Sequence, residues 1–131
     1  MTNNEHGGSV WANGKNGGYV RLHNNKHGGD VVAEGKDGGA AQLSNSVHGG
    51  ILGATSKDGS SASLGVDEHG GHVAAWGKDG GYATLTNNEH GGLMAIFNKG
   101  DKNVLQASVG DTGRGIITTK DKLGYRTGSL P

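Results

Sequence analysis

The motif His-Gly-Gly recurs in this chain at residues 6, 27, 48, 69 and 90, always 21 residues apart. Regular self-similarity of this kind is typical of stacked-repeat proteins, in which each unit covers apolar surface of its neighbours. We therefore interpret residues 1–131 as a single repeat domain. Its repeats span approximately residues 3–23, 24–44, 45–65, 66–86 and 87–109, and a degenerate capping repeat follows at 110–131.

Composition and charge restrict the partners of the chain. Its 12 basic residues balance 12 acidic residues, and it contains no cysteine. Net neutrality argues against nucleic-acid binding, which depends on clustered Lys and Arg. No segment approaches the roughly 20 consecutive apolar residues of a membrane-spanning helix. We therefore predict neither a nucleic-acid partner nor a membrane partner.

Each repeat carries two turn signals separated by short alternating segments. Residues 66–86 show the pattern clearly as VDEHGG-HVAAWG-KDGG-YATLT. The first signal is Glu-His-Gly-Gly or a relative, and the second is Lys-Asp-Gly-Gly or a relative. The segments of five or six residues between them alternate in polarity, which is typical of β-strands. The sequence predicts an all-β fold, an antiparallel meander of about twelve short strands.

The turns also predict the register of the strands. A three-residue Lys-Asp-Gly loop pairs Trp76 with Tyr82, and Asp before Gly is the composition of a type I turn with a bulge. A four-residue loop on the other side places Leu85 opposite Met94. Histidine is among the residues enriched at positive φ, so we expect the repeated histidine to serve the turn. A longer turn is expected at 99–103.

One face of the predicted sheet is constant across repeats, whereas the other varies. Each unit offers about four apolar side chains to the constant face, two of them usually alanine, so one chain has little to bury. We predict that these faces pack together in a homotrimeric β-prism, with a filament as a further form of self-assembly. The alternative is a single-chain β-solenoid or roll. The predicted interface or core residues are Val10, Ala12, Val31, Ala33, Val73, Ala75, Ala83, Leu85, Met94 and Ile96.

The variable face carries aromatic side chains. Trp76 and Tyr82 are cross-strand neighbours in the predicted register, and such pairs usually contribute about 0.2–1 kcal/mol by packing. The alternative interpretation is a platform on which sugar rings stack. The candidate ligand surface consists of Trp11, Tyr19, His72, Trp76 and Tyr82.

The repeated histidines are the candidate metal ligands. Consecutive members lie two strands apart, or about 10 Å, which is too far for two of them in one chain to share a zinc ion. Convergence around a threefold axis would restore that possibility. We otherwise expect no metal and no cofactor. The histidines concerned are His6, His27, His48, His69 and His90.

No arrangement of nucleophile, base and orienting group is visible in the sequence. The serines at 56, 60, 61 and 63 lie in a stretch of small residues without a G-x-S-x-G elbow. The carboxylates are isolated at turns. We therefore predict a protein that is not an enzyme.

The E-H-G-G-x-V-x-x-x-G-K-D-G unit and the terminal K-D-K-L-G-Y-R stretch at 120–126 resemble glycine-rich repeat regions of uncharacterised proteins from environmental bacteria. The architecture, with short strands perpendicular to the long axis, is similar to that of the trimeric β-prism shafts of phage tail fibres. The resemblance implies a rod, spacer or fibre module and transfers no catalytic residue. It favours an extracellular, virion or cell-surface location, although this chain shows no signal peptide. The alternative function is a glycan-binding, lectin-like module.

Overall fold

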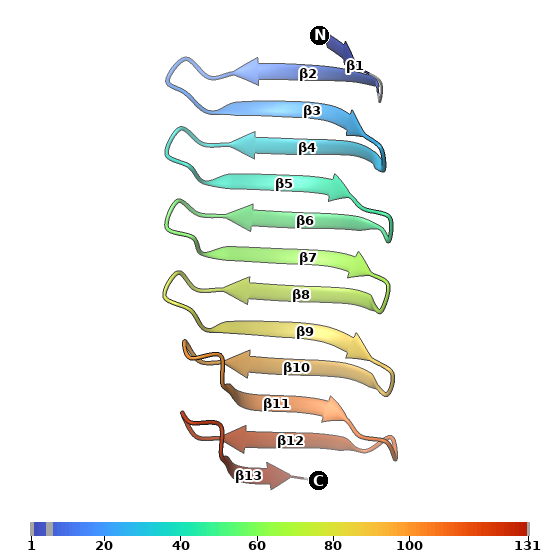
Figure 1. The fold of residues 1–131 in the computed structure, drawn as a ribbon, viewed down its shortest axis with the longest axis vertical. Coiled ribbons are helices and arrows are strands. Elements are labelled where there is room, and N and C mark those ends of the chain that lie inside the picture. Colours follow the sequence, from blue (N-terminus) through green and yellow to red (C-terminus); the bar gives the residue numbers. More distant parts are fainter. Residues whose placement is uncertain (1, 5–6, 131) are drawn as a thin grey trace.

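The computed structural model describes residues 2–4 and 7–130. Within these residues the chain forms thirteen β-strands that join into one sheet in sequence order (Figure 1). The strands are β1 (Thr2–Asn4), β2 (Gly7–Asn13), β3 (Tyr19–Asn25), β4 (Gly28–Glu34), β5 (Ala40–Asn45), β6 (Gly50–Thr55), β7 (Ser61–Asp67), β8 (Gly70–Trp76), β9 (Tyr82–Asn88), β10 (Gly91–Phe97), β11 (Asn103–Val109), β12 (Gly115–Lys120) and β13 (Arg126–Leu130).

The sheet is a single open layer. Its strands lie across the long axis of the molecule, and their turns form two long edges (Figure 1). Every strand pairs antiparallel with the next, so the predicted all-β meander is confirmed, and the short β1 adds one strand to the expected twelve. The alternative of a solenoid or roll is wrong for this chain, because the sheet does not close on itself. The described residues contain no helix able to span a membrane.

One edge, which we call the lysine edge, is formed by the Lys-Asp-Gly turns. The amide of Gly77 donates to the carbonyl of Gly81 at 3.0 Å, and the amide of Gly80 donates to the carbonyl of Gly77 at 3.2 Å. Gly80 has a φ of 83°, as a type I turn with a bulge requires. Trp76 pairs with Tyr82. The predicted three-residue loop and its register are therefore confirmed.

The turn at 98–102 was expected to be longer, and this expectation is wrong. The amide of Asn98 donates to the carbonyl of Lys102 at 3.0 Å, as Gly77 does to Gly81. Asp101 occupies the left-handed position with a φ of 56°. The extra residue is absorbed next to the turn, where the pairing of β10 with β11 shifts at Phe97.

The opposite edge, the histidine edge, has tighter turns than expected. Asn88 pairs directly with Gly91, so the loop contains two residues and not four, although Leu85 faces Met94 as predicted. The positive φ falls on the glycine after the histidine, as at Gly28 (138°) and Gly91 (136°). No described histidine has a positive φ. The expectation that histidine adopts the positive φ is therefore wrong. Glycine adopts it, because glycine lacks a Cβ.

The side chains of one face include two rows that run the length of the sheet. We call this the apolar face, and its neighbours along each row are direct cross-strand partners. The central row consists of Val10, Leu22, Val31, Leu43, Leu52, Leu64, Val73, Leu85, Met94, Ala107, Ile117 and Leu130. The alanine row, on the side of the lysine edge, consists of Ala12, Val20, Ala33, Ala41, Ala54, Ala62, Ala75, Ala83, Ile96, Leu105, Thr119 and Gly128.

The single layer leaves almost nothing buried. Among the described residues, the buried apolar side chains are Ala74 and Ala95, and both lie on the face opposite the apolar face, which we call the mixed face. The chain exposes 8721 Å². A compact monomer of its 13.3 kDa mass would expose about 6,500 Å². The fold therefore has two faces and no interior of its own.

The turn geometry yields a test. Gly80→Ala should lower the free energy of unfolding by about 1–2 kcal/mol, because alanine is strained at a φ of 83° and its Cβ would lie 3.0 Å from the carbonyl oxygen of Lys99. Gly53→Ala, in a strand and in ordinary contact only, should be neutral or slightly stabilising. Denaturant titration of both variants measures the difference. Equal effects would contradict the assigned turn.

Candidate interaction surfaces

The central row of the apolar face is exposed along the sheet. Leu64 is 55% exposed, Leu85 is 53% exposed and Met94 is 38% exposed. Most of the large apolar side chains that the described residues leave exposed belong to this face. A continuous apolar patch of this size is typical of an interaction surface in a soluble protein.

Glycine and alanine predominate on both sides of the central row. On one side lies the alanine row. On the other side, towards the histidine edge, lies a third row that we call the glycine row: Gly8, Asn24, Gly29, Asn45, Gly50, Val66, Gly71, Asn87 and Gly92. Shallow hollows lie over both flanking rows. One is lined by Ala62 and Ala75 beside Leu64, and the other by Gly71 and Gly92 beside Leu85.

All the predicted interface or core residues lie on the apolar face. Val73 and Leu85 are direct partners in the central row, and Ala75 and Ala83 are direct partners in the alanine row. Of the set, Ala33 is half-buried and the others are exposed. These residues therefore share one face of the sheet, and within one chain they do not enclose a core.

The predicted ligand residues lie on the mixed face, in separate places. Trp76 and Tyr82 have ring centroids 6.5 Å apart, and Phe97 extends the row, stacking on Tyr82 at 4.2 Å. Trp11 and Tyr19 form a second pair at 5.3 Å on β2 and β3, well away from the first. The three-ring row of Trp76, Tyr82 and Phe97 is therefore the larger aromatic surface.

His72, the fifth candidate ligand residue, belongs to neither aromatic group. It lies on β8 opposite Gly65, and its Nε2 would be 3.2 Å from a Cβ at that glycine. Its Nδ1 is 3.6 Å from a carboxylate oxygen of Asp67. The backbone amide of His69 donates to Asp67, and this bond, with the nearby His72, holds the pKa of the Asp67 carboxyl below its usual range. His72 therefore lies with Asp67 at the histidine edge and is not part of an aromatic surface.

Three of the histidine turns are capped by the polar residue two positions before the histidine. The amide of His27 donates to Oδ1 of Asn25 at 2.7 Å, and the amide of His69 donates to Oδ1 of Asp67 at 2.8 Å. The amide of His48 donates to the hydroxyl of Ser46 at 3.2 Å. Short side-chain acceptors of this kind stabilise turns. The recurring Asn, Ser or Asp is a signal that our sequence analysis missed.

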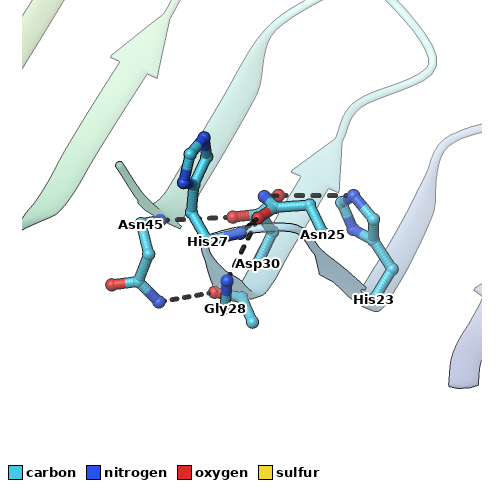
Figure 2. Close-up of polar contacts among 7 residues, drawn as sticks. His23, Asn25, His27, Gly28, Asp30 and Asn45 are labelled. Carbon is cyan, nitrogen blue, oxygen red and sulfur yellow. Dashed lines mark hydrogen bonds and ion pairs between the residues drawn. The ribbon is translucent and has the colours of Figure 1, made fainter. Parts of the chain in front are cut away.

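A polar cluster joins three strands at this edge around Asp30, which is only 7% exposed (Figure 2). One carboxylate oxygen of Asp30 accepts a bond from Asn25 at 2.7 Å and lies 3.3 Å from Nε2 of His23. The other accepts a bond from the backbone amide of Asn45 at 3.3 Å. Asn45 also donates from its side chain to the carbonyl of Gly29 at 2.9 Å. The cluster ties β3, β4 and β5 together.

In the described part of the chain, the candidate metal ligands do not come together as a site. The described residues contain no group of three His, Cys, Asp or Glu side chains arranged to hold a metal ion. His27 points away from Asp30 (Figure 2), and His90 lies 3.2 Å from a carboxylate oxygen of Asp111. His48 and His69 are exposed at their turns, and His6 lies outside the described residues.

Comparison with known proteins gives no match. No family model fits the chain, and neither a curated protein nor a solved structure is significantly similar to it.

The Asp30 cluster yields a test of what stabilises the histidine edge. Asp30→Ala should lower the free energy of unfolding by about 1–3 kcal/mol, because Asn25 and the amide of Asn45 lose a buried acceptor. Asp37→Ala, in an exposed turn, should change it by no more than about 0.5 kcal/mol. Denaturant titration measures both. Equal losses would show that the cluster adds nothing beyond an exposed aspartate.

Proposed function

We propose that this chain is a non-catalytic structural module, a shaft, spacer or fibre element that self-associates through its apolar face. The observation that carries the proposal is the uncovered central row, which runs from β2 to β13 without a partner layer. A stable interface buries about 800 Å² on each partner. The exposed area of the chain exceeds that of a compact protein of its mass by more than this amount.

The repeat supports a structural role for this surface. Repeats of 21 residues present the same apolar positions in successive units, so the surface is uniform along the molecule. A uniform surface of this kind suits lengthwise association of identical chains. The homotrimeric β-prism is the assembly we propose, because closed cyclic symmetry covers three identical faces at once. An extracellular, virion or cell-surface shaft is the setting this role implies.

Self-association can be tested with two neighbouring substitutions on β5. Leu43→Lys introduces a charge into the central row, whereas Gln42→Lys places the same charge on the mixed face, where Gln42 is exposed. We expect the wild-type chain and Gln42→Lys to sediment as oligomers, with a mass that is a larger multiple of the 13.3 kDa of one chain. Leu43→Lys should weaken association at least tenfold, because an unpaired buried ammonium is costly. A monomeric wild-type chain would refute the proposal.

The aromatic row favours a second candidate function, glycan binding. Trp76 is 40% exposed and continues the stack of Tyr82 on Phe97, which gives a flat apolar strip beside the hydroxyl groups of Ser61 and Thr84. Sugar rings can stack on such strips. This function is compatible with self-association, since it uses the opposite face of the sheet.

Glycan-array binding tests the second candidate. Trp76→Ala should abolish any glycan signal of the wild-type chain, because it removes one end of the strip. Ile116→Ala, also on the mixed face but remote on β12, should keep the signal. A wild-type chain that binds no glycan, or a signal that survives Trp76→Ala, would contradict a sugar platform at this row.

A further inference from the structure

We propose that three copies of the chain pack with their central rows on a common threefold axis. In this arrangement, the alanine row of each copy contacts the glycine row of the next. The inference rests on the self-association proposed above and specifies which residues occupy which part of the assembly. It follows from the position of the central row and from the heights of the three rows.

The central row lies in the middle of the strands. In the seven-residue strands β7, β8 and β9, its members Leu64, Val73 and Leu85 are each the fourth residue. Val10 and Met94 hold the same place in β2 and β10. The bulkiest apolar side chains therefore form a ridge along the midline of the face.

On the strands whose flanking residues are glycine and alanine, the height of the face falls off towards both edges. On β8, for example, Val73 stands between Gly71 and Ala75, each two residues away on the same face. The hollows over the alanine row and the glycine row follow from this difference in side-chain size. The apolar face is therefore a ridge between two shallow troughs.

Two such faces cannot cover one another completely. Paired flat sheets stand about 10 Å apart over their whole width. If the central rows of two copies met, they would hold the flanking rows of the two sheets apart. The empty space over the alanine and glycine rows would cost stability. Shifting one sheet sideways to seat a ridge in a trough leaves the other trough uncovered. A two-sheet sandwich therefore does not match this profile.

A triangular prism matches this profile on β2, β4, β6 and β8, where a glycine and an alanine flank the central residue. Seven residues at about 3.3 Å each, together with their turns, give a wall of about 23–30 Å, so the midline of each wall lies about 7–9 Å from the axis. That distance suits valine and leucine side chains that meet at the centre. Two residues from the midline, adjacent walls are only about 5–8 Å apart, a spacing that favours the small side chains that predominate in both flanking rows.

The symmetry also explains why the two flanking rows differ. Around a threefold axis, each corner joins the lysine edge of one copy to the histidine edge of the next. The alanine row therefore meets the glycine row at all three corners, and strand β8 of each copy lies at the same height. Ala75 of one copy thus faces Gly71 of its neighbour.

Engineered cysteines test this arrangement in the intact chain, which contains no cysteine of its own. With a short bismaleimide cross-linker, Val73→Cys should give covalent dimers, because its three thiols surround the axis. Ala75→Cys alone and Gly71→Cys alone should give none, because their copies point into different corners. The double variant Gly71→Cys/Ala75→Cys should give covalent trimers. A Cβ at Gly71 meets nothing closer than 3.9 Å, so this substitution does not strain the sheet.

Sedimentation of the wild-type chain separates the two proposals. A monomer would refute self-association and this arrangement together. A dimer, or a trimer in which Ala75→Cys forms dimers and Val73→Cys does not, would refute the threefold arrangement while self-association stands. If Val73→Cys fails to assemble, Leu64→Cys and Ala62→Cys on β7 repeat the same comparison, since they occupy the same two rows.

Discussion

Consecutive strands hydrogen-bond to one another along the whole chain, and within the described residues each strand contacts only its neighbours in sequence. Such a meander satisfies the backbone locally and needs no long loop to close. It also leaves the side chains of both faces exposed, because a single layer has no second layer to pack against. The apolar face, the sparse core and the large exposed area all follow from this one constraint.

The turns keep consecutive strands paired in one layer over all thirteen strands. At the lysine edge, the bulged three-residue loop needs a left-handed residue, which Gly80 provides. At the histidine edge, a two-residue loop is capped by the side chain of Asn25, Ser46 or Asp67. Because each loop preserves the register, valine and leucine stay in one row and alanine in another. A slip of one residue would move both rows to the opposite face.

The period and the alternation of polarity were sufficient to predict the strands, the pairing of Trp76 with Tyr82 and the membership of the apolar face. They were insufficient where a residue departs from the repeat. Asp30 stands where Ile51 and Leu93 stand in other units, and its contacts with His23 across the sheet emerge only from the fold. The positive φ of the glycine that follows each described histidine turn, as at Gly28 and Gly91, was also missed, because composition does not say which of several adjacent residues bends the chain.

The two faces of the sheet have different consequences for function. The apolar face is uniform and suits a repeated contact with identical chains, whereas the mixed face differs from unit to unit and carries the aromatic row. An assembly that hides the first face presents the second to solvent. Structural and binding roles can therefore coexist in this architecture, with the repeat supplying the scaffold and the varied positions supplying any recognition.

Hydroxyl-radical footprinting with mass spectrometry tests most directly whether the apolar face is covered in solution. It compares the oxidation rates of Leu64, Leu85 and Met94 with those of Trp76 and Tyr82 in the same native sample. Our account predicts strong protection of the first group relative to the denatured chain, while Trp76 at the end of the aromatic row remains reactive. Oxidation of Leu64, Leu85 and Met94 at rates near those of the denatured chain would contradict it.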